Sequence, residues 1–334
     1  MPKPPTVPTS TFGIWLAGAR PRTLPAAVVP VIVGTACAAG LGRAGSIAVT
    51  DLPSNVSALV YDSGPLKGLI IWRFLAALVV SLFIQIGTNY ANDYSDGKRG
   101  TDDPGQRVGP PRLVGWGLVP AKQVKAAAFL SFGVAALAGL ALAAAVGWWL
   151  ILVGLVSFAA GWFYTGGPRP YGYAGFGEAF VFVFFGLVAT VGSYFVQVER
   201  LATPGLVIGA AVAVGCLATA LLVINNLRDI PSDTVSGKRT LAVRIGDRKT
   251  RIFYVVLIVL PFVLVPFVCG LGGRPLGAAS LFAIVLANKP VLQVLQGAQG
   301  RALIPVLGQT GRVQLVFGVL LAVGVYLSAP AVLG

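Results

Sequence analysis

The stretch "IIWRFLAALVVSLFIQIGTNYANDYSDGKRGTDD", residues 70–103, joins a long apolar run to a dense cluster of carboxylates. The apolar part, 70–93, is long enough to cross a hydrocarbon layer of roughly 30 Å, which takes about 20 helical residues. Four aspartates then follow within eleven positions, although the whole chain has only 11 acidic residues. A membrane-crossing helix that ends in such a cluster predicts a polar site at the mouth of a membrane bundle.

The same kind of apolar run recurs along the whole chain. Hydrophobic residues make up 56% of the 334 residues and charged residues 11%, a composition typical of membrane proteins. Lys289 and Pro290 interrupt the eighth run, 275–296, which is therefore expected to be short or bent. We predict an all-α membrane protein, a bundle of about nine transmembrane helices around a central cavity that faces the cytoplasm. The runs are 19–42, 70–93, 122–145, 147–165, 174–198, 203–227, 251–272, 275–296 and 310–332.

The domain organisation follows from these runs. Residues 1–18, rich in Pro and Thr, are expected to be a disordered tail, and 19–332 to form a single transmembrane domain. Long cytoplasmic loops are expected at 94–121 and 228–250. If the chain crosses the membrane at each of the nine runs, 20 of the 25 Lys and Arg residues lie on the same side of the membrane as the N-terminus. Since cytoplasmic loops carry the basic excess, this predicts a cytoplasmic N-terminus and an external C-terminus in the cell (inner) membrane.

The net charge of +14 does not indicate a nucleic-acid-binding protein, because the basic residues lie in short loops at helix ends. Anionic small molecules and membrane lipids are the partners that fit. The chain has no histidine, which excludes His-based catalytic triads and His-ligated metals. The three cysteines all lie in apolar runs and share no close spacing. Any metal ion must therefore be held by oxygen.

The carboxylate cluster has a counterpart later in the chain. Asn92-x3-Asp96 is followed by Gly-Lys-Arg, and Asn225-x3-Asp229, with Asp233 after it, is also followed by Gly-Lys-Arg. The two motifs are four runs apart, so both open at the same end of the bundle, as in a same-sense internal repeat. Pro231 is expected to end one helix, with Asp233 as the N-cap of the next.

Converging carboxylates repel each other, so something positive has to lie between them. Oxygen ligands without His or Cys suit Mg²⁺, which typically bridges one or two carboxylates to substrate phosphates. Lys98, Arg228 and Lys238 add positive charge beside the motifs, which favours a diphosphate over a bare cation. The alternative is that these are solvated loop carboxylates neutralised by their basic neighbours.

At this point the chain resembles a family, the UbiA-type intramembrane prenyltransferases. The resemblance lies in Asn92-Asp93-x-x-Asp96 and Asp229-x-x-x-Asp233. The stretches "RPRTLPAAVVPVIVG", "YTGGPRPYGYAGFGE" and "NNLRDIPSDTVSGKRTLAVRIG" are similar to its menaquinone-pathway branch. In the wider family the first motif continues to a further Asp where this chain has Gly100. Asp102 or Asp103 is the candidate for that ligand.

The resemblance implies Mg²⁺-dependent transfer of a polyprenyl group from polyprenyl diphosphate to 1,4-dihydroxy-2-naphthoate, with decarboxylation. It implies that Asn92, Asp93, Asp96, Asp229 and Asp233 hold the metal. The implied catalytic residues are Asn225 with the same aspartates Asp96, Asp229 and Asp233. The implied substrate-binding residues are Lys98, Arg169, Arg228 and Lys238 for the diphosphate, Tyr164 for the allylic cation, and Arg22 for the acceptor's carboxylate.

Three alternatives remain at this stage. A prenyltransferase for another aromatic acceptor would share every motif. A cation-coupled transporter also uses same-sense repeats and buried carboxylates, but would place them near mid-membrane rather than at helix ends. A lipid-headgroup transferase would need further aspartates at fixed spacing along one helix, and the sequence has none.

Overall fold

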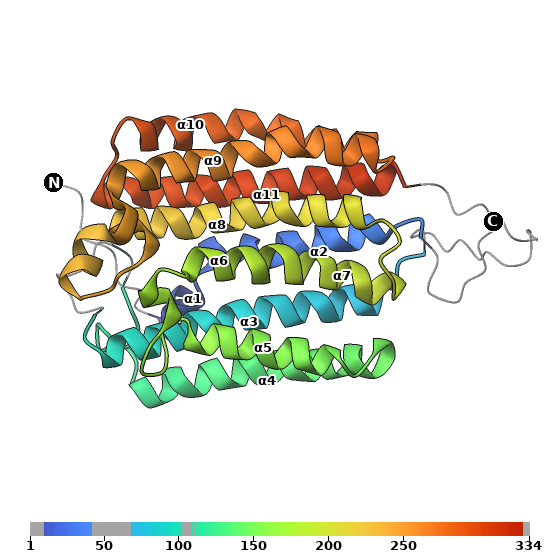
Figure 1. Ribbon diagram of the computed structural model, residues 1–334. Helices are drawn as coiled ribbons and strands as arrows, with labels where there is room; N and C mark the ends of the chain where they lie inside the picture. Colours follow the sequence, from blue (N-terminus) through green and yellow to red (C-terminus); the bar gives the residue numbers. More distant parts are fainter. Residues whose placement is uncertain (1–9, 42–67, 102–108, 110, 330–334) are drawn as a thin grey trace, which may run out of the picture.

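The computed structural model describes residues 10–41, 68–101, 109 and 111–329, and this part of the chain is helical. Asp102, Asp103 and most of the segment between the first two apolar runs lie outside the described residues. The helices are long and lie side by side (Figure 1). Their bounds are α1 Thr11–Ala19, η1 Pro21–Thr23, α2 Pro25–Ala38, α3 Ile71–Lys98, α4 Ala121–Val146, α5 Leu150–Phe163, η4 Tyr171–Ala174, α6 Gly177–Val181, η5 Phe182–Val188, α7 Ala189–Val198, α8 Pro204–Val235, α9 Leu241–Leu271, η6 Pro275–Ala283, α10 Ile284–Leu295, η7 Gly300–Ala302 and α11 Leu303–Leu327.

The described residues hold seven segments long and apolar enough to cross a membrane, or eight if a bent pair counts as one span. The expected nine are therefore not all found. The bent pair is Thr11–Thr23 with Pro25–Ala38, at 52°. The fourth expected run, 147–165, forms α5, which has only 14 residues and is not among these segments. The eighth run does form one span, Pro275–Leu295, whose first part is a 3₁₀ helix.

Of the expected tail, 1–18, the structure describes the part from residue 10 onward, and this part forms α1. The side chain of Ser10 accepts a hydrogen bond from the backbone N–H of Gly13, so α1 begins as a capped helix. It ends at Arg20, whose φ of 55° is left-handed. Pro21 and Pro25 then start the next two elements, because a proline is tolerated in the first helical turn.

Helices extend into both segments expected as cytoplasmic loops, 94–121 and 228–250. The α3 helix runs to Lys98 and α8 to Val235, while α9 already begins at Leu241. Pro231 lies inside α8 and does not end it, and Asp233 is therefore not an N-cap. Proline has a helical φ, so a helix can pass through it when the lost hydrogen bond is tolerated. Both motifs end at the same side of the bundle, as the spacing predicts (Figure 1).

The centre of the bundle is α8, in which 78% of an 18-residue apolar stretch is buried. It packs against α9, α11, α2 and η5, whereas at one side α4 packs on α3, and α5 packs on both α3 and α4. Small residues allow backbones to approach closely where lipid gives no hydrophobic drive. A Cβ on Gly186 of η5 would lie 2.6 Å from the Cα of Gly215 in α8. The contact between α2 and α7 is as close, at Gly34.

We expect Gly34→Ala to destabilise the protein by about 1–3 kcal/mol, because the new Cβ would lie 2.0 Å from the carbonyl oxygen of Thr190 and α2 must move away from α7. Thermal unfolding in detergent measures this. The control is Gly133→Ala in α4, where a Cβ meets nothing within 4 Å. Equal unfolding temperatures for the two variants would contradict the close packing of α2 on α7.

Candidate active site

A cavity of about 950 Å³ runs through the bundle between α3, α5, α7 and α8. Both aspartate motifs reach it. Its lining includes Asn92, Asp96, Asn225, Asp229 and Asp233. The structure therefore brings together two motifs that are more than a hundred residues apart in the chain. Arg22, Tyr164, Arg228 and Lys238 line the same cavity.

Asp96 is held by two partners from other elements. The ammonium of Lys238 lies 3.3 Å from its Oδ2, and the hydroxyl of Tyr173 donates to its Oδ1. The Lys238 ammonium also lies 4.7 Å from the centre of the Tyr173 ring. Burial, followed by the negative charge of Asp96, raises the pKa of Tyr173, which therefore stays protonated as a donor. This cluster joins the end of α3 to η4 and to the segment after α8.

Asp229 carries its own counter-charge. The guanidinium of Arg228 donates from Nε and Nη2 to the two carboxylate oxygens, each at 2.7 Å. Such a bidentate pair is strong and fixed in geometry. Arg228 is only 4% exposed, so the pair is buried in the wall of the cavity. One full positive charge thus lies beside each of the two motifs.

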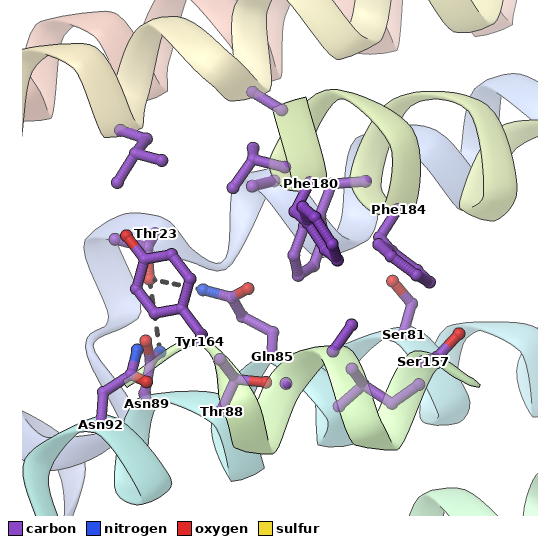
Figure 2. Close-up of a pocket in the computed structure, with 18 of the residues that line it drawn as sticks. Thr23, Ser81, Gln85, Thr88, Asn89, Asn92, Ser157, Tyr164, Phe180 and Phe184 are labelled. Atoms are coloured by element: carbon purple, nitrogen blue, oxygen red, sulfur yellow. Dashed lines mark hydrogen bonds between the residues drawn. The ribbon is translucent and has the colours of Figure 1, made fainter. Parts of the chain in front are cut away.

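The loop 164–176 covers this end of the cavity. The hydroxyl of Thr165 donates to the side-chain oxygen of Asn92 at 2.8 Å. Arg99 donates to the carbonyl oxygens of Thr165 and Gly167. These contacts fasten the loop to the end of α3. Tyr164, at the start of the loop, therefore lies against the cavity, as Figure 2 shows.

Three residues predicted for the site do not line the cavity. Asp93, expected to bind metal, accepts hydrogen bonds from the backbone N–H groups of Leu113 at 3.0 Å and Val114 at 2.9 Å. It lies about 100° further round α3 than Asn92 and so points elsewhere. Lys98 is exposed and lies over the ring of Tyr94, and Arg169 is exposed on the loop. The structure therefore does not bring these three side chains to the cavity, and their roles at the site stay predictions.

The sequence prediction also missed several polar groups of the cavity. Tyr173 and Thr165 lie in a Gly- and Pro-rich stretch, where their partners could not be inferred. The face of α3 that carries Ser81, Gln85 and Asn89 could have been found, because these residues precede Asn92 and Asp96 at helical spacing. All three line the cavity and are labelled in Figure 2.

The other half of the cavity is apolar and aromatic. The ring of Phe180 stacks on that of Tyr171 at 3.9 Å between centroids, and on that of Phe184 at 5.9 Å. The ring of Tyr164 meets Tyr171 edge-on at 5.5 Å. This row of four rings leads from the aspartates into the bundle. Phe184 lies in η5, a π-helical turn, and such turns occur often at functional sites.

A sequence model of the UbiA prenyltransferase family matches residues 52–305. The chain belongs to this family. Among its relatives, the 1,4-dihydroxy-2-naphthoate octaprenyltransferase of Mycobacterium tuberculosis is 46% identical, over 94% of this chain and 97% of its own. The enzyme of the same name from Escherichia coli is 36% identical, over 94% of this chain and 95% of its own. The protein is therefore an integral membrane polyprenyltransferase.

Solved structures of UbiA homologues share the fold. The homologue from Aeropyrum pernix K1 superposes with a TM-score of 0.62 at 12% identity, covering 89% of this chain and 97% of its own. The homologue from Archaeoglobus fulgidus bound to DMAPP and Mg²⁺ gives 0.56 at 14% identity, covering 92% and 99%. Among the residues that the structure of this protein describes, no three His, Cys, Asp or Glu side chains form a metal-binding group.

The position of Asp93 predicts a structural role. We expect Asp93→Asn to destabilise the protein by about 1–3 kcal/mol, because its amide group can no longer accept from both Leu113 and Val114. Thermal unfolding measures this. The concentration of divalent cation that gives half-maximal activity should not change. A variant of normal stability with a much higher cation requirement would instead show that Asp93 is a ligand.

Proposed function

We propose that this enzyme transfers a polyprenyl group from polyprenyl diphosphate to 1,4-dihydroxy-2-naphthoate with loss of CO₂, giving the demethylmenaquinone skeleton for menaquinone synthesis. The observation that carries the proposal is the single cavity, lined by both aspartate motifs at one end and by aromatic rings further in. The high identity to the naphthoate octaprenyltransferases supports the choice of acceptor.

The charged end suits a diphosphate with Mg²⁺. Mg²⁺ needs few protein ligands, since one or two carboxylates with substrate phosphates suffice. Asn92, Asp96, Asp229 and Asp233 offer hard oxygen atoms from two helices, α3 and α8, and Asn225 on α8 lines the same cavity. These residues fit the ion and would hold it. Bound there, Mg²⁺ would supply charge neutralisation for the leaving diphosphate.

Arg228 and Lys238 would bind the diphosphate oxygens. In the structure each neutralises a carboxylate, Asp229 and Asp96 respectively. A divalent cation at the carboxylates would free both side chains to turn toward the diphosphate. Arg22, on η1 at the other wall of the cavity, would bind the carboxylate of the acceptor.

The aromatic half suits the isoprenoid. Tyr164 stands at its entrance, where the ring face would stabilise the allylic cation formed when the C–O bond breaks. Phe180 and Phe184 would pack on the chain beyond it. A second, small apolar pocket on the outer side of Tyr171, Phe180 and Phe184 adjoins this wall. A long tail would leave the bundle there, between α5 and α6, and enter the lipid.

The chemistry balances without a proton acceptor. The allylic C–O bond breaks and its electron pair leaves with the diphosphate. The ring carbon that bears the carboxylate forms the new C–C bond. The C–C bond to that carboxylate then breaks, its electron pair restores the aromatic ring, and CO₂ leaves. The cavity needs only to hold the two reacting carbons together and to keep water from the cation.

The orientation is also part of the proposal. The basic excess at the end that carries the aspartates would place it in the cytoplasm, with the N-terminus inside and the C-terminus outside the cell (inner) membrane. The soluble acceptor would then enter from the cytoplasm, and the donor from the lipid.

The proposal is tested with the purified protein in detergent or nanodiscs. Given Mg²⁺, polyprenyl diphosphate and 1,4-dihydroxy-2-naphthoate, it should release CO₂ and diphosphate in equal amounts and form the prenylated naphthoquinol. A panel of other aromatic acids, including 4-hydroxybenzoate, should react much more slowly. No product from the naphthoate, or faster reaction of another acceptor, would exclude this function.

We expect Asp96→Asn and Asp229→Asn each to lower kcat by about 100-fold or more, since each removes one charge that organises the cation and diphosphate. Thermal unfolding should show that both variants remain folded. Asp247→Asn is the control, because Asp247 pairs with Arg251 on α9 and does not line the cavity. Full activity of either cavity variant would count against its role.

A further inference from the structure

Three polar side chains on α3 are tied to the first helices by their hydrogen-bond donors. The hydroxyl of Ser81 donates to the carbonyl oxygen of Ala27 at 2.8 Å. Nε2 of Gln85 donates to the hydroxyl oxygen of Thr23 at 3.1 Å. Nδ2 of Asn89 donates to the carbonyl oxygen of Ala19 at 2.9 Å. Figure 2 shows Gln85 and Asn89 directed at Thr23 from one face of α3.

These bonds fix which way the two amides face. Because each NH₂ group is bound to α1 or η1, each carbonyl oxygen is left for the cavity that both residues line. Gln85 is 9% exposed and Asn89 is 4% exposed. Neither oxygen accepts a hydrogen bond from the part of the chain that the structure describes. Two oriented acceptors thus face the cavity, where a ligand can donate to them.

A ligand for these oxygens carries no negative charge at that point, so it is either a cation or a hydrogen-bond donor. The carboxylate of α3 that would hold a cation, Asp96, lies about two turns beyond Asn89 and three beyond Gln85, which favours a donor at the two amides. An isoprenoid has no donor. A diphosphate has only acceptors, and carbonyl oxygens would repel it. Among the substrates of the proposed function, only the hydroxyl groups of the aromatic acceptor can donate. The amides also lie on α3 opposite the aromatic residues Phe180 and Phe184 proposed for the tail (Figure 2).

We propose that Gln85 and Asn89 bind the two hydroxyl groups of the dihydroxynaphthoate, an inference that rests on the function proposed above. Residues four apart on a helix have Cβ atoms about 6 Å apart, which matches hydroxyl groups at opposite ends of one ring. Asn89 is one turn closer to Asn92 and Asp96, where the donor's reacting carbon would lie. Asn89 therefore takes the hydroxyl next to the carboxylate, and Gln85 takes the remote one.

Thr23 is the positioning residue of this subsite. Its hydroxyl oxygen accepts from Gln85 at 3.1 Å and from Asn89 at 3.5 Å, and donates to the carbonyl oxygen of Arg20 at 3.0 Å. One side chain thus ties both amides to the turn that carries Arg22. Without it, Gln85 could rotate and turn its NH₂ group into the cavity.

The first test uses the unaltered enzyme and compounds that compete with 1,4-dihydroxy-2-naphthoate. 1-Hydroxy-2-naphthoate lacks the remote hydroxyl and should bind about tenfold more weakly than 1,4-dihydroxy-2-naphthoate itself. The 4-methyl ether should bind as weakly, because Gln85 Oε1 can only accept a hydrogen bond and the ether has none to donate. A 4-methyl ether that binds as tightly as 1,4-dihydroxy-2-naphthoate would overturn the assignment to Gln85.

The second test is Gln85→Met, which keeps length and removes the amide. The KM for dihydroxynaphthoate should rise about tenfold, while the KM for polyprenyl diphosphate and the inhibition by 1-hydroxy-2-naphthoate stay unchanged. Thr23→Val should give a smaller change with the same selectivity. The matched control is Gln314→Met, a fully buried Gln on α11 that does not line the cavity.

The outcomes separate this inference from the function itself. An unaltered enzyme that makes no product would remove the proposed function. An active enzyme in which Gln85→Met weakens the binding of dihydroxynaphthoate and of 1-hydroxy-2-naphthoate equally would show that Gln85 only packs the helix. A change confined to the KM of the donor would assign the amide to the diphosphate substrate. Either of the last two results overturns the inference and leaves the function intact.

Discussion

The site depends on keeping carboxylates charged inside a membrane bundle. A buried charge is costly unless it is paired, and removal of one partner leaves the other unpaired. Asp96 is neutralised by Lys238 and by the hydroxyl of Tyr173, and Asp229 by Arg228. The first of these contacts crosses between elements: Lys238 follows α8, Tyr173 lies in η4 and Asp96 ends α3. The pairing that makes the charges tolerable therefore also assembles the end of the cavity.

The same pairing accounts for the split character of the cavity. The two ion pairs, Asp96 with Lys238 and Asp229 with Arg228, lie at the end of the cavity where both motifs meet, and the wall formed by α4, α5, η5 and α7 holds only neutral side chains. In the proposed function a diphosphate would thereby be confined to the mouth and a hydrocarbon chain to the interior. The C–O bond that breaks in prenyl transfer joins the diphosphate to the hydrocarbon chain. The boundary between the charged and the apolar part of the cavity would therefore position this bond. Tyr164 stands at this boundary.

Much of this could be predicted from the sequence, and the failures have physical causes. The repeated Asn-x3-Asp pattern at the ends of apolar runs indicated the convergence of Asp96 and Asp229, because an even number of spans returns the chain to the same side. The sequence could not distinguish Asp93 from Asp96, since the partners of Asp93 are backbone N–H groups twenty residues away. Nor could it show that Lys238 reaches the cavity while Lys98, in the matching position of the repeat, lies outside. The span count failed at a short helix and at a proline bend, where length and hydropathy are ambiguous.

The neutral amides of α3 show how a membrane site can be selective without additional charge. A charged side chain halfway along the cavity would need its own counter-ion, and would compete with the aspartates for the diphosphate. An amide whose NH₂ group is bound to a neighbouring helix has no such cost, and it presents one fixed acceptor. Gln85 and Asn89 are held in this way by bonds that also join α3 to α1 and η1. The hydrogen bonds that pack these helices are therefore the ones that orient the two amide oxygens. Helix packing and the orientation of the amides cannot vary independently.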